Sequence, residues 1–177
     1  MIKVNDITQT ITEQKESLDK SKFEIPRDIL KKLSTGIDNF ALIISGIRRA
    51  GKSTVLRQLI RKNRSRSLYL NFDTPRLYNF TISDFEVLDL VIQAEKYKTL
   101  YFDEIQIIEG WEVYVRQKLD QKYRVVISGS NSSMLSQELG TKLTGRHISK
   151  ELFPFSYKEF LRFINQGAGE ESYKEFL

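Results

Sequence analysis

An eight-residue run in the first third of the chain has the residue types and the spacing of a phosphate-binding loop. The run GIRRAGKS, from Gly46 to Ser53, fits the pattern GxxxxGK followed by Ser or Thr. Glycines at the fixed positions let the backbone wrap a phosphate so that amide N–H groups point inward at the anion. A helix that begins after the run would add the positive end of its dipole. We therefore expect the Lys52 ammonium to reach the β- and γ-phosphates of a nucleotide and the Ser53 hydroxyl to bind Mg²⁺.

The sequence around this run favours a phosphate site over the alternative, a glycine-rich turn with an incidental lysine. A continuous apolar segment of the kind found in buried strands, Ala41–Ser45, comes directly before it. After it, apolar residues recur at helical spacing, at positions 55, 56, 59 and 60. The sequence thus predicts a strand, a loop and a helix in the order that the chemistry requires. The residues expected to contact the nucleotide are Gly46, Ile47, Arg48, Arg49, Ala50, Gly51, Lys52, Ser53 and Thr54.

A second candidate motif is an apolar segment that ends in two adjacent carboxylates, Asp103 and Glu104. A carboxylate at the end of a strand beside the loop suits a ligand to Mg²⁺ or to its waters, and we assign that role to Asp103. Glu104 leaves the strand, where it would orient and deprotonate an attacking water. Asp73, at the end of another apolar segment, competes for the metal but lacks an adjacent glutamate. A solvated strand end without a chemical role is the alternative interpretation.

A third motif is the run VVISGSN, from Val125 to Asn131, in which an apolar segment leads to polar side chains. Ser130 or Asn131 at such a tip would hydrogen-bond the γ-phosphate or the attacking water. The same residues are equally suited to cap a helix that begins at Ser132 or Ser133. The two roles are compatible when they fall on neighbouring residues.

These motifs need elements that hold them at one edge of a common sheet. Short apolar segments read as strands, and helical patterns alternate with them, which favours an α/β layered fold with a mainly parallel sheet. The predicted strands are Ala41–Ser45, Ser67–Phe72, Thr99–Asp103, Arg124–Ser128 and His147–Leu152. The predicted helices are Pro26–Ser34, Lys52–Lys62, Asp84–Lys96, Gly110–Lys122, Ser132–Leu139 and Ser156–Ile164. Residues 1–24 are polar with weak periodicity, so we expect an N-terminal arm that is short or flexible, followed by one core domain over residues 25–177.

The composition bounds the chemistry that these residues can perform. The chain has 177 residues, enough for one domain, and contains no cysteine and a single histidine, His147. Disulfides, thiolate nucleophiles and zinc sites built on sulfur or on paired histidines are therefore excluded, and any metal is expected to be Mg²⁺ held by oxygens. The net charge of +5 permits nucleic-acid contact without requiring it. No apolar run approaches the ~20 residues of a membrane span, and the N-terminus lacks the layout of a signal peptide, so we expect a cytoplasmic protein.

Together the motifs resemble the prokaryotic AAA-like ATPases of the extended AAA family, in the additional-strand, catalytic-glutamate class of P-loop ATPases. The resemblance covers approximately residues 25–165 and keeps the motif order of the family. The matching text is GIRRAGKST, LYLNFDTPRL, LYFDEIQ followed by Gly110 and Trp111, ISGSNSSML, and LTGRHISKELFPFSYKEFL. It implies a three-layer P-loop NTPase fold with a mainly parallel five-stranded sheet of order 5-1-4-3-2. It also implies ATP and Mg²⁺ as the cofactors.

The resemblance assigns a role to the arginine before the fifth strand, Arg146. In similar proteins such an arginine reaches the nucleotide bound by a neighbouring subunit, which implies a homo-oligomer; the alternative is a surface or domain-contact arginine. Relatives continue after this core into a helical lid and a C-terminal domain, and neither fits within 177 residues. We therefore expect the chain to lack the lid and to hydrolyse ATP only weakly on its own. We also expect the apolar corner Leu152–Phe155 to pack against the lid or the next domain. A DNA or protein partner would then bind through the region after Leu177.

The residues favour an ATP-binding, Mg²⁺-dependent ATPase core, in which hydrolysis drives a conformational change, over three alternatives. A GTP switch would carry an Asn-Lys-x-Asp motif and an Asp-x-x-Gly after the metal strand, and the sequence has neither. A small-molecule kinase would need a lid arginine and an acceptor site, and would not need Asp103 and Glu104 in tandem. A non-hydrolysing, nucleotide-dependent module that binds DNA or a partner protein stays open, because the net charge and the loop arginines allow it. A measurement of ATP turnover separates that module from an ATPase.

Overall fold

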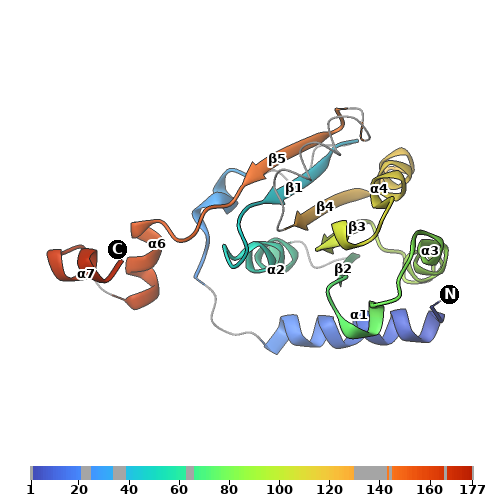
Figure 1. Ribbon diagram of the computed structural model, residues 1–177, viewed down its shortest axis with the longest axis horizontal. Helices are drawn as coiled ribbons and strands as arrows, with labels where there is room; N and C mark the ends of the chain where they lie inside the picture. The colour runs from blue at the N-terminus through green and yellow to red at the C-terminus, as the bar shows by residue number, and fades with distance from the viewer. Residues whose placement is uncertain are drawn as a thin grey trace.

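The sheet that carries the predicted motifs consists of five parallel strands. The computed structural model describes residues 2–20, 25–33, 39–62, 66–129, 143, 145–165 and 167–176. The strands are β1 (Ala41–Ser45), β2 (Ser67–Asn71), β3 (Thr99–Asp103), β4 (Arg124–Gly129) and β5 (His147–Glu151). They lie in the order β2-β3-β4-β1-β5, each parallel to its neighbours (Figure 1). Because this order is 5-1-4-3-2 when counted from the other edge, the predicted fold class and strand order are confirmed.

The helices that alternate with these strands also follow the prediction, with ends that differ by a few residues. The helix bounds are α1 (Val4–Lys20), α2 (Lys52–Lys62), α3 (Phe85–Ala94), α4 (Trp111–Asp120), α6 (Tyr157–Ile164) and α7 (Glu170–Phe176). Short 3-10 turns are η1 (Asp28–Lys31), η2 (Pro75–Leu77), η3 (Ile82–Asp84) and η4 (Ile105–Ile107). The predicted helix Ser132–Leu139 lies outside the described residues. None of the helices in the described ranges has the length and the apolar character needed to cross a membrane.

Helices cover both faces of the sheet, which gives three layers. Helices α3 and α4 pack on one face, and α2 packs on the other. The faces arise from alternation along the strands: Ala41 and Ile43 join the core with α3 and α4, whereas Leu42 and Ile44 join the core with α2. All of β1 is buried, as expected for a central strand of a parallel sheet that is covered on both faces.

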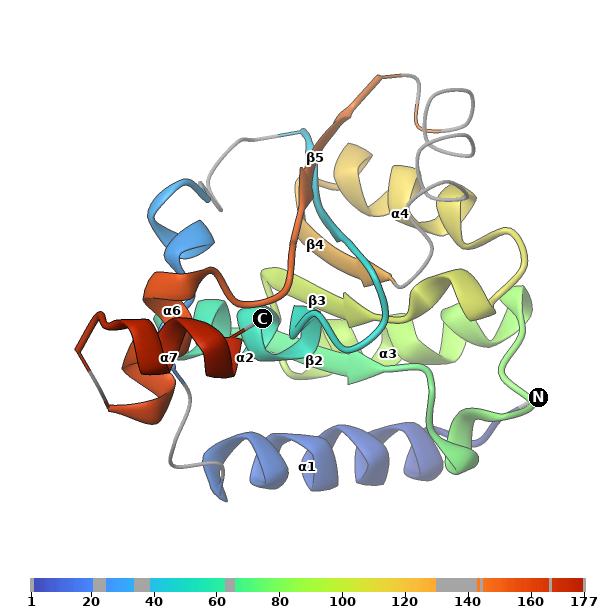
Figure 2. The ribbon, with the colours of Figure 1, turned by 60° about the vertical axis from the view of Figure 1, so that its left-hand side comes forward.

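The N-terminal segment differs from the expected arm, because residues 4–20 form a helix that packs on the domain. Ile7, Ile11 and Leu18 of α1 are buried, with a spacing that places them on one side of a helix. The helix runs along β2, the edge strand of the sheet (Figure 2). There the Gln14 side chain donates to the Asn71 carbonyl at 3.0 Å and accepts from the Asn71 N–H at 2.8 Å. The polar composition of the segment conceals this sparse apolar stripe, which covers an otherwise open sheet edge.

The predicted helix Pro26–Ser34 is present only as the single 3-10 turn η1. The residues before the turn are held extended by the side chain of Gln58 on α2. Its amide nitrogen donates to the Ile25 carbonyl at 2.9 Å, and its amide oxygen accepts from the Arg27 N–H at 3.2 Å. Because these hydrogen bonds keep Ile25 and Arg27 extended, the helical turn begins at Asp28 and not at Pro26.

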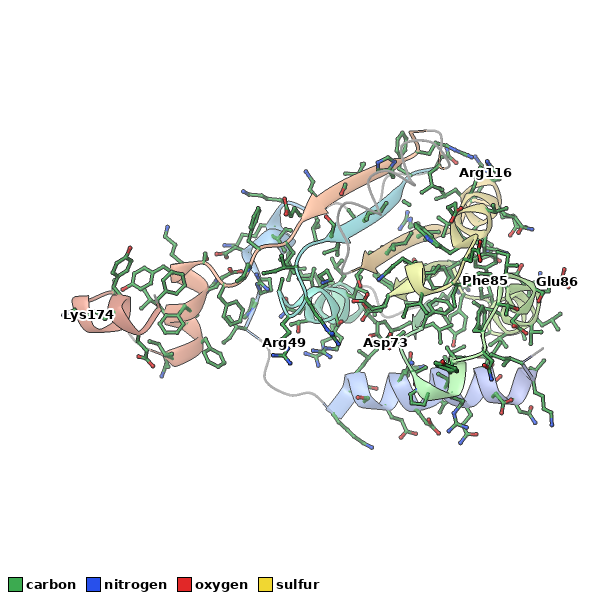
Figure 3. The ribbon with its side chains drawn as sticks, in the orientation of Figure 1. Arg49, Asp73, Phe85, Glu86, Arg116 and Lys174 are labelled. Carbon is green, nitrogen blue, oxygen red and sulfur yellow. The ribbon has the colours of Figure 1, made fainter. Side chains whose placement is uncertain are left out.

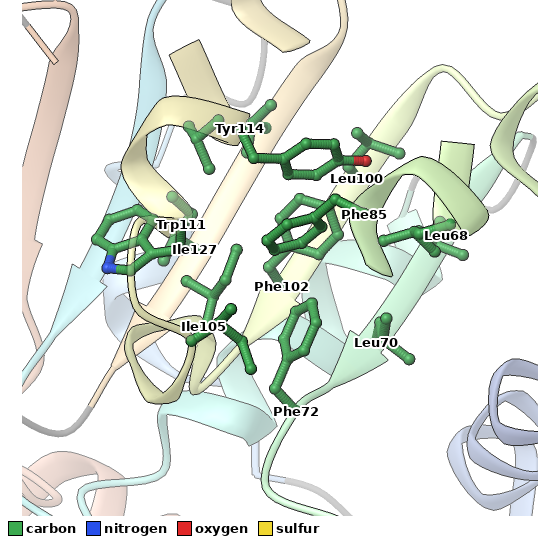
Figure 4. Close-up of a cluster of buried hydrophobic side chains, with 14 of the residues drawn as sticks. Leu68, Leu70, Phe72, Phe85, Leu100, Phe102, Ile105, Trp111, Tyr114 and Ile127 are labelled. Atoms are coloured by element: carbon green, nitrogen blue, oxygen red, sulfur yellow. The ribbon is translucent and has the colours of Figure 1, made fainter. Parts of the chain in front are cut away.

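An aromatic cluster supports the end of β3, from which the acidic motif emerges (Figure 4). The Phe85 ring stacks on Tyr114 with 3.9 Å between centroids, and Phe72 packs edge-on against Phe85 at 5.9 Å. Ile105, the residue directly after Glu104, belongs to the same core and is fully buried. Because the residue after it is anchored in this core, Glu104 projects from a firmly held turn.

Candidate nucleotide-binding site

The predicted phosphate loop connects β1 to α2 at the carboxyl ends of the parallel strands (Figure 2). Both of its glycines have backbone conformations that other residues rarely adopt, with φ of +147° at Gly46 and +92° at Gly51. A Cβ atom at Gly46 would lie 2.2 Å from the Leu152 carbonyl oxygen. A Cβ atom at Gly51 would lie 2.8 Å from Nη1 of Arg27. Glycine is therefore favoured at both positions by the backbone conformation and by the close approach of Leu152 and Arg27.

Lys52 lies within the loop instead of in solvent, with an exposed fraction of 5%. Its Nζ donates to the carbonyl oxygens of Gly46 and Ile47 at 3.0 and 2.9 Å. Burial lowers the pKa of the Lys52 ammonium, and the carboxylates of Glu104 and Asp103 act in the opposite direction. Both members of the acidic motif therefore lie close enough to Lys52 to influence the pKa of its ammonium.

Between its glycines, the loop exposes the side chains of Ile47, Arg48 and Arg49 and buries Ala50. Arg49 has a left-handed φ of 67°, so the chain turns sharply before the second glycine. Figure 3 shows the Arg49 side chain at the surface beside α2. The loop arginines thus add positive charge around the loop without filling its centre.

Ser53 and Thr54 lie in the first turn of α2, and both are half-buried. The first turn of a helix carries N–H groups without intrahelical partners and the positive end of the helix dipole, so it suits an anion. Nη2 of Arg57 donates to the Thr54 hydroxyl at 3.0 Å and orients it. The position of Ser53 directly after Lys52 fits the predicted hydroxyl ligand for Mg²⁺.

Asp103 ends β3 and is fully buried. The Ser128 hydroxyl on β4 donates to one of its carboxylate oxygens, and the Tyr69 hydroxyl on β2 donates to the other at 2.9 Å. Burial first, and the Asp103 carboxylate second, raise the pKa of Tyr69, so the phenol stays protonated and remains a donor. The competing residue Asp73 is exposed after β2 (Figure 3), which favours Asp103 as the metal-binding carboxylate.

Glu104 leaves β3 through a left-handed conformation, with φ 55° and ψ 34°. Its N–H donates to the Ser128 carbonyl at 3.0 Å, and its carboxylate accepts a hydrogen bond from the Gln106 side chain. The side chain is half-buried, so solvent reaches a carboxylate that is otherwise held in place.

The remaining candidates do not join this group within the described residues. Ser130 and Asn131 lie outside those residues; β4, which ends at Gly129 directly before them, runs between β1 and β3. Arg146 precedes β5 and therefore lies at the amino ends of the strands. At the usual rise per strand residue, this is roughly 17 Å from the carboxyl ends, where the loop lies. Its guanidinium pairs with Asp120 at 2.7 Å.

Three residues around the site were not identified from the sequence: Tyr69, Ser128 and Arg27. Ser128 and Asp103 are direct partners in the β3–β4 register, so the predicted strand order already contained that contact. Tyr69 lies diagonally across β2 from Asp103, two residues before the register partner Asn71, where a long side chain can reach. Arg27 carries no comparable sequence signal, because its contacts come from tertiary packing.

A cavity of about 690 Å³ lies beside the loop. Gly51 and Thr54 line it on the loop side, and Phe155, Phe160 and Phe163 line it on the side of α6. A cavity of this size with aromatic walls suits a flat organic group of drug-like dimensions. Its position beside Gly51 makes it a candidate site for the base and ribose of a nucleotide bound through the predicted phosphate loop.

The donor atoms at the site fit Mg²⁺. In the described part of the chain, no three residues of the types His, Cys, Asp and Glu gather closely enough to hold a metal by themselves. Mg²⁺ is commonly held by one or two protein oxygens together with substrate phosphates and waters. The Ser53 hydroxyl and the Asp103 carboxylate, beside a phosphate loop, supply oxygens of that kind.

Comparisons with known proteins find a family model and relatives that cover most of this chain. A family model described as an AAA domain matches residues 38–161. An uncharacterized protein of Methanocaldococcus jannaschii is 39% identical over 143 residues, which is 80% of this chain and 32% of that protein. An uncharacterized protein of Haemophilus influenzae is 37% identical over 138 residues, 72% of this chain and 34% of that protein. The chain thus spans about a third of the length of these relatives. The solved structure of C. elegans PCH-2 is similar with a TM-score of 0.46 and 16% identity, over 95% of this chain and 49% of that one.

Proposed function

This chain belongs to the AAA domain family, and we propose that it binds ATP together with Mg²⁺ and hydrolyses it to ADP and phosphate. The observation that carries the proposal is the placement of Lys52 after β1 and of Asp103 and Glu104 at the end of β3, both at the carboxyl ends of the parallel strands. A phosphate loop, a metal carboxylate and an adjacent base are the parts that hydrolysis of a nucleoside triphosphate needs.

In this proposal the loop amides and Lys52 hold the β- and γ-phosphates, and Ser53 and Asp103 hold Mg²⁺, which neutralises charge on the phosphate oxygens. Glu104 orients a water and takes its proton. The water oxygen forms a bond to the γ-phosphorus, and the bond from that phosphorus to the β–γ bridging oxygen breaks. ADP leaves with the electron pair of that bond. Tyr69 and Ser128 orient the Asp103 carboxylate by donating to both of its oxygens.

The cavity beside the loop supports adenine over guanine. Guanine presents N–H donors on its pairing edge, and proteins that select it commonly offer a carboxylate acceptor. The described residues that line the cavity include aromatic rings and arginines but neither Asp nor Glu. This agrees with the lack of a guanine-reading motif in the sequence.

We further propose that hydrolysis drives a conformational change. We also propose that the protein assembles into a homo-oligomer and is located in the cytoplasm. Because the chain covers about a third of its relatives, DNA or a protein is proposed as a partner of the whole protein rather than of this domain alone. Glu104, directly after Asp103, favours hydrolysis over a non-hydrolysing binding module, because it supplies a base that such a module does not need.

Replacing Lys52 by Ala is expected to weaken ATP binding at least tenfold, about 1.4 kcal/mol, because the loop loses its buried cation. The measurement is calorimetric titration of ATP in Mg²⁺ buffer. Lys62→Ala, an exposed lysine at the other end of α2, serves as the matched control and should bind like the parent. Equal affinity in the Lys52→Ala and parent proteins would remove the phosphate-loop assignment.

Replacing Asp103 by Ala is expected to abolish most of the Mg²⁺ dependence of ATP affinity, since a metal ligand or the anchor of its waters is lost. The affinity for ATP is measured by titration with Mg²⁺ and with EDTA. The parent should show a large difference between the two conditions and Asp103→Ala a small one. Asp73→Ala, which removes the competing carboxylate, should behave as the parent. The reverse pattern would move the metal role to Asp73.

A further inference from the structure

Arg27 lies between the phosphate loop and the C-terminal part of the chain, and it is 4% exposed. Its Nη1 donates to the carbonyl oxygen of Ala50, within the loop, at 2.6 Å. Its Nη2 donates to the carbonyl oxygen of Phe153, in the segment between β5 and α6, at 2.7 Å. The guanidinium carbon lies 4.9 Å from the centroid of the Phe155 ring. One buried side chain thus joins the phosphate loop to the segment that leads into α6.

The counter-ion of Arg27 is Glu159, in the first turn of α6, which is also 4% exposed. Its Oε1 accepts from Arg27 Nε at 2.9 Å and from the Asp28 N–H at 2.8 Å, and its Oε2 accepts from the Ser156 N–H at 2.9 Å. Burial raises the pKa of Glu159, but the two backbone donors and Arg27 outweigh burial and hold the pKa at about 2. The stability that the pair contributes is therefore present above the ordinary pKa of 4.5 and is lost only as the pH falls toward about 2.

The bond to Ala50 fixes the orientation of one peptide group in the loop. In a planar trans peptide, the N–H of Gly51 points opposite to the carbonyl oxygen of Ala50. Since Arg27 holds that carbonyl toward itself, the N–H of Gly51 is directed to the other side of the chain. Amide N–H groups of this part of a phosphate loop are the groups that bind phosphate. Arg27 can thus orient a phosphate-binding group without touching the phosphate.

The beginning of the loop rests on the same C-terminal segment. The N–H of Leu152 donates to the Ser45 carbonyl at 2.7 Å, and the Leu152 carbonyl occupies the space that a Cβ at Gly46 would need. Residues 152–153 therefore contact the first glycine directly and the second through Arg27. A displacement of α6, which carries Glu159, would disturb both ends of the loop.

We propose that the buried Arg27–Glu159 pair positions the phosphate loop and makes its anion-binding conformation depend on the docking of α6. The inference rests on the proposed function, because it concerns the loop that binds ATP there. By linkage, α6 docking and nucleotide binding then favour each other by the same factor. Toward the phosphates both are positioning residues, because Arg27 acts through the backbone of Ala50 and Glu159 acts through Arg27.

A second ion pair between the same two elements provides a matched control. Arg162 on α6 lies 2.9 Å from Asp28 on η1, with exposed fractions of 39% and 40% for the two side chains. An exposed pair of this kind contributes little to stability. Arg162→Ala removes this link between η1 and α6 while it leaves the Arg27 contacts in place.

The test compares Mg²⁺-ATP affinity in the full chain for Arg27→Ala, Glu159→Ala and Arg162→Ala. Calorimetry is performed at one temperature for all variants, about 15 °C below the lowest of their melting temperatures, so that folded molecules are compared. We expect roughly tenfold weaker binding for Arg27→Ala and Glu159→Ala, and affinity within about twofold of the parent for Arg162→Ala. Arg27→Lys keeps the charge but loses the fork of donors, so its affinity should be intermediate. If the alanine variants do not fold, Arg27→Lys and Glu159→Gln carry the comparison.

Hydrogen exchange supplies a readout that does not need nucleotide. In the nucleotide-free protein, the amides of residues 47–51 should exchange faster in Arg27→Ala than in Arg162→Ala. Added ATP should slow exchange in residues 157–164 of the parent but not of Glu159→Ala. Affinities and exchange rates of the Arg27 and Glu159 variants equal to those of Arg162→Ala would overturn the inference. Failure of the parent to bind ATP would instead reject the proposed function, and loop exchange would still decide this inference.

Discussion

Replacing Glu104 by Gln is expected to lower the rate of ATP hydrolysis at least about a hundredfold while ATP affinity stays within about twofold of the parent. The amide keeps the shape of the side chain and its hydrogen bond with Gln106, but it cannot take a proton from water. The backbone bond from Glu104 to Ser128 does not involve the side chain, so the turn should keep its left-handed conformation. Phosphate release at saturating ATP measures the rate, and calorimetry measures the affinity.

Glu109→Gln is the matched control for this experiment, because Glu109 is an exposed carboxylate in the same connection between β3 and α4. It should hydrolyse ATP at the parent rate. Hydrolysis by Glu104→Gln at the parent rate would show that Glu104 is not the base. A parent chain that binds ATP but releases no phosphate would favour the non-hydrolysing module.

The strands and the phosphate loop could be predicted because each has a recognisable pattern in its own short stretch of sequence. The apolar runs that end at Ser45 and Asp103 have the bounds of β1 and β3, and α2 has its predicted bounds. Buried central strands of a parallel sheet are almost continuously apolar, so their limits are sharp in the sequence. The strand order followed from resemblance instead, since no local pattern encodes which strands are neighbours.

The parts that were not predicted depend on tertiary contacts. Helix α1 carries few apolar residues, and it is held on the domain by Ile7 and Ile11 in the core and by Gln14, which pairs with the backbone of Asn71 on the edge strand. The turn η1 is short because the Gln58 side chain holds the residues before it. Arg27 and Glu159 are 132 positions apart. The run from Ser156 to Glu159 has the pattern of a helix capping box, but nothing in the local sequence pairs Glu159 with Arg27. Contacts of this kind are made by the folded chain as a whole.

Arg146 is the candidate whose role depends on a second subunit. It precedes β5, and its backbone carbonyl accepts from the Ala41 N–H at the start of β1. It therefore lies at the amino ends of the strands, whereas the phosphate loop lies at their carboxyl ends. It cannot serve the nucleotide of its own chain from there. Its ion pair with Asp120 is partly exposed, and such pairs contribute about 0–1 kcal/mol. The guanidinium could therefore exchange that carboxylate for a phosphate offered by a neighbouring molecule at small cost.

Replacing Arg146 by Ala is expected to reduce ATP hydrolysis in the full-length assembly by roughly 10³-fold or more and to leave ATP binding unchanged, since a guanidinium delivered to the transition state contributes ~10³–10⁵ in related phosphoryl transfers. Arg124→Ala is the matched control, because Arg124 is an exposed arginine at the start of β4, at the same amino ends of the strands. Mixing Arg146→Ala with Lys52→Ala should restore part of the activity, since one subunit binds ATP and the other lends its arginine. Hydrolysis is measured against the mixing ratio and the total protein concentration. A monomer with full activity, or a mixture that stays inactive although the two variants assemble, would return Arg146 to a structural role.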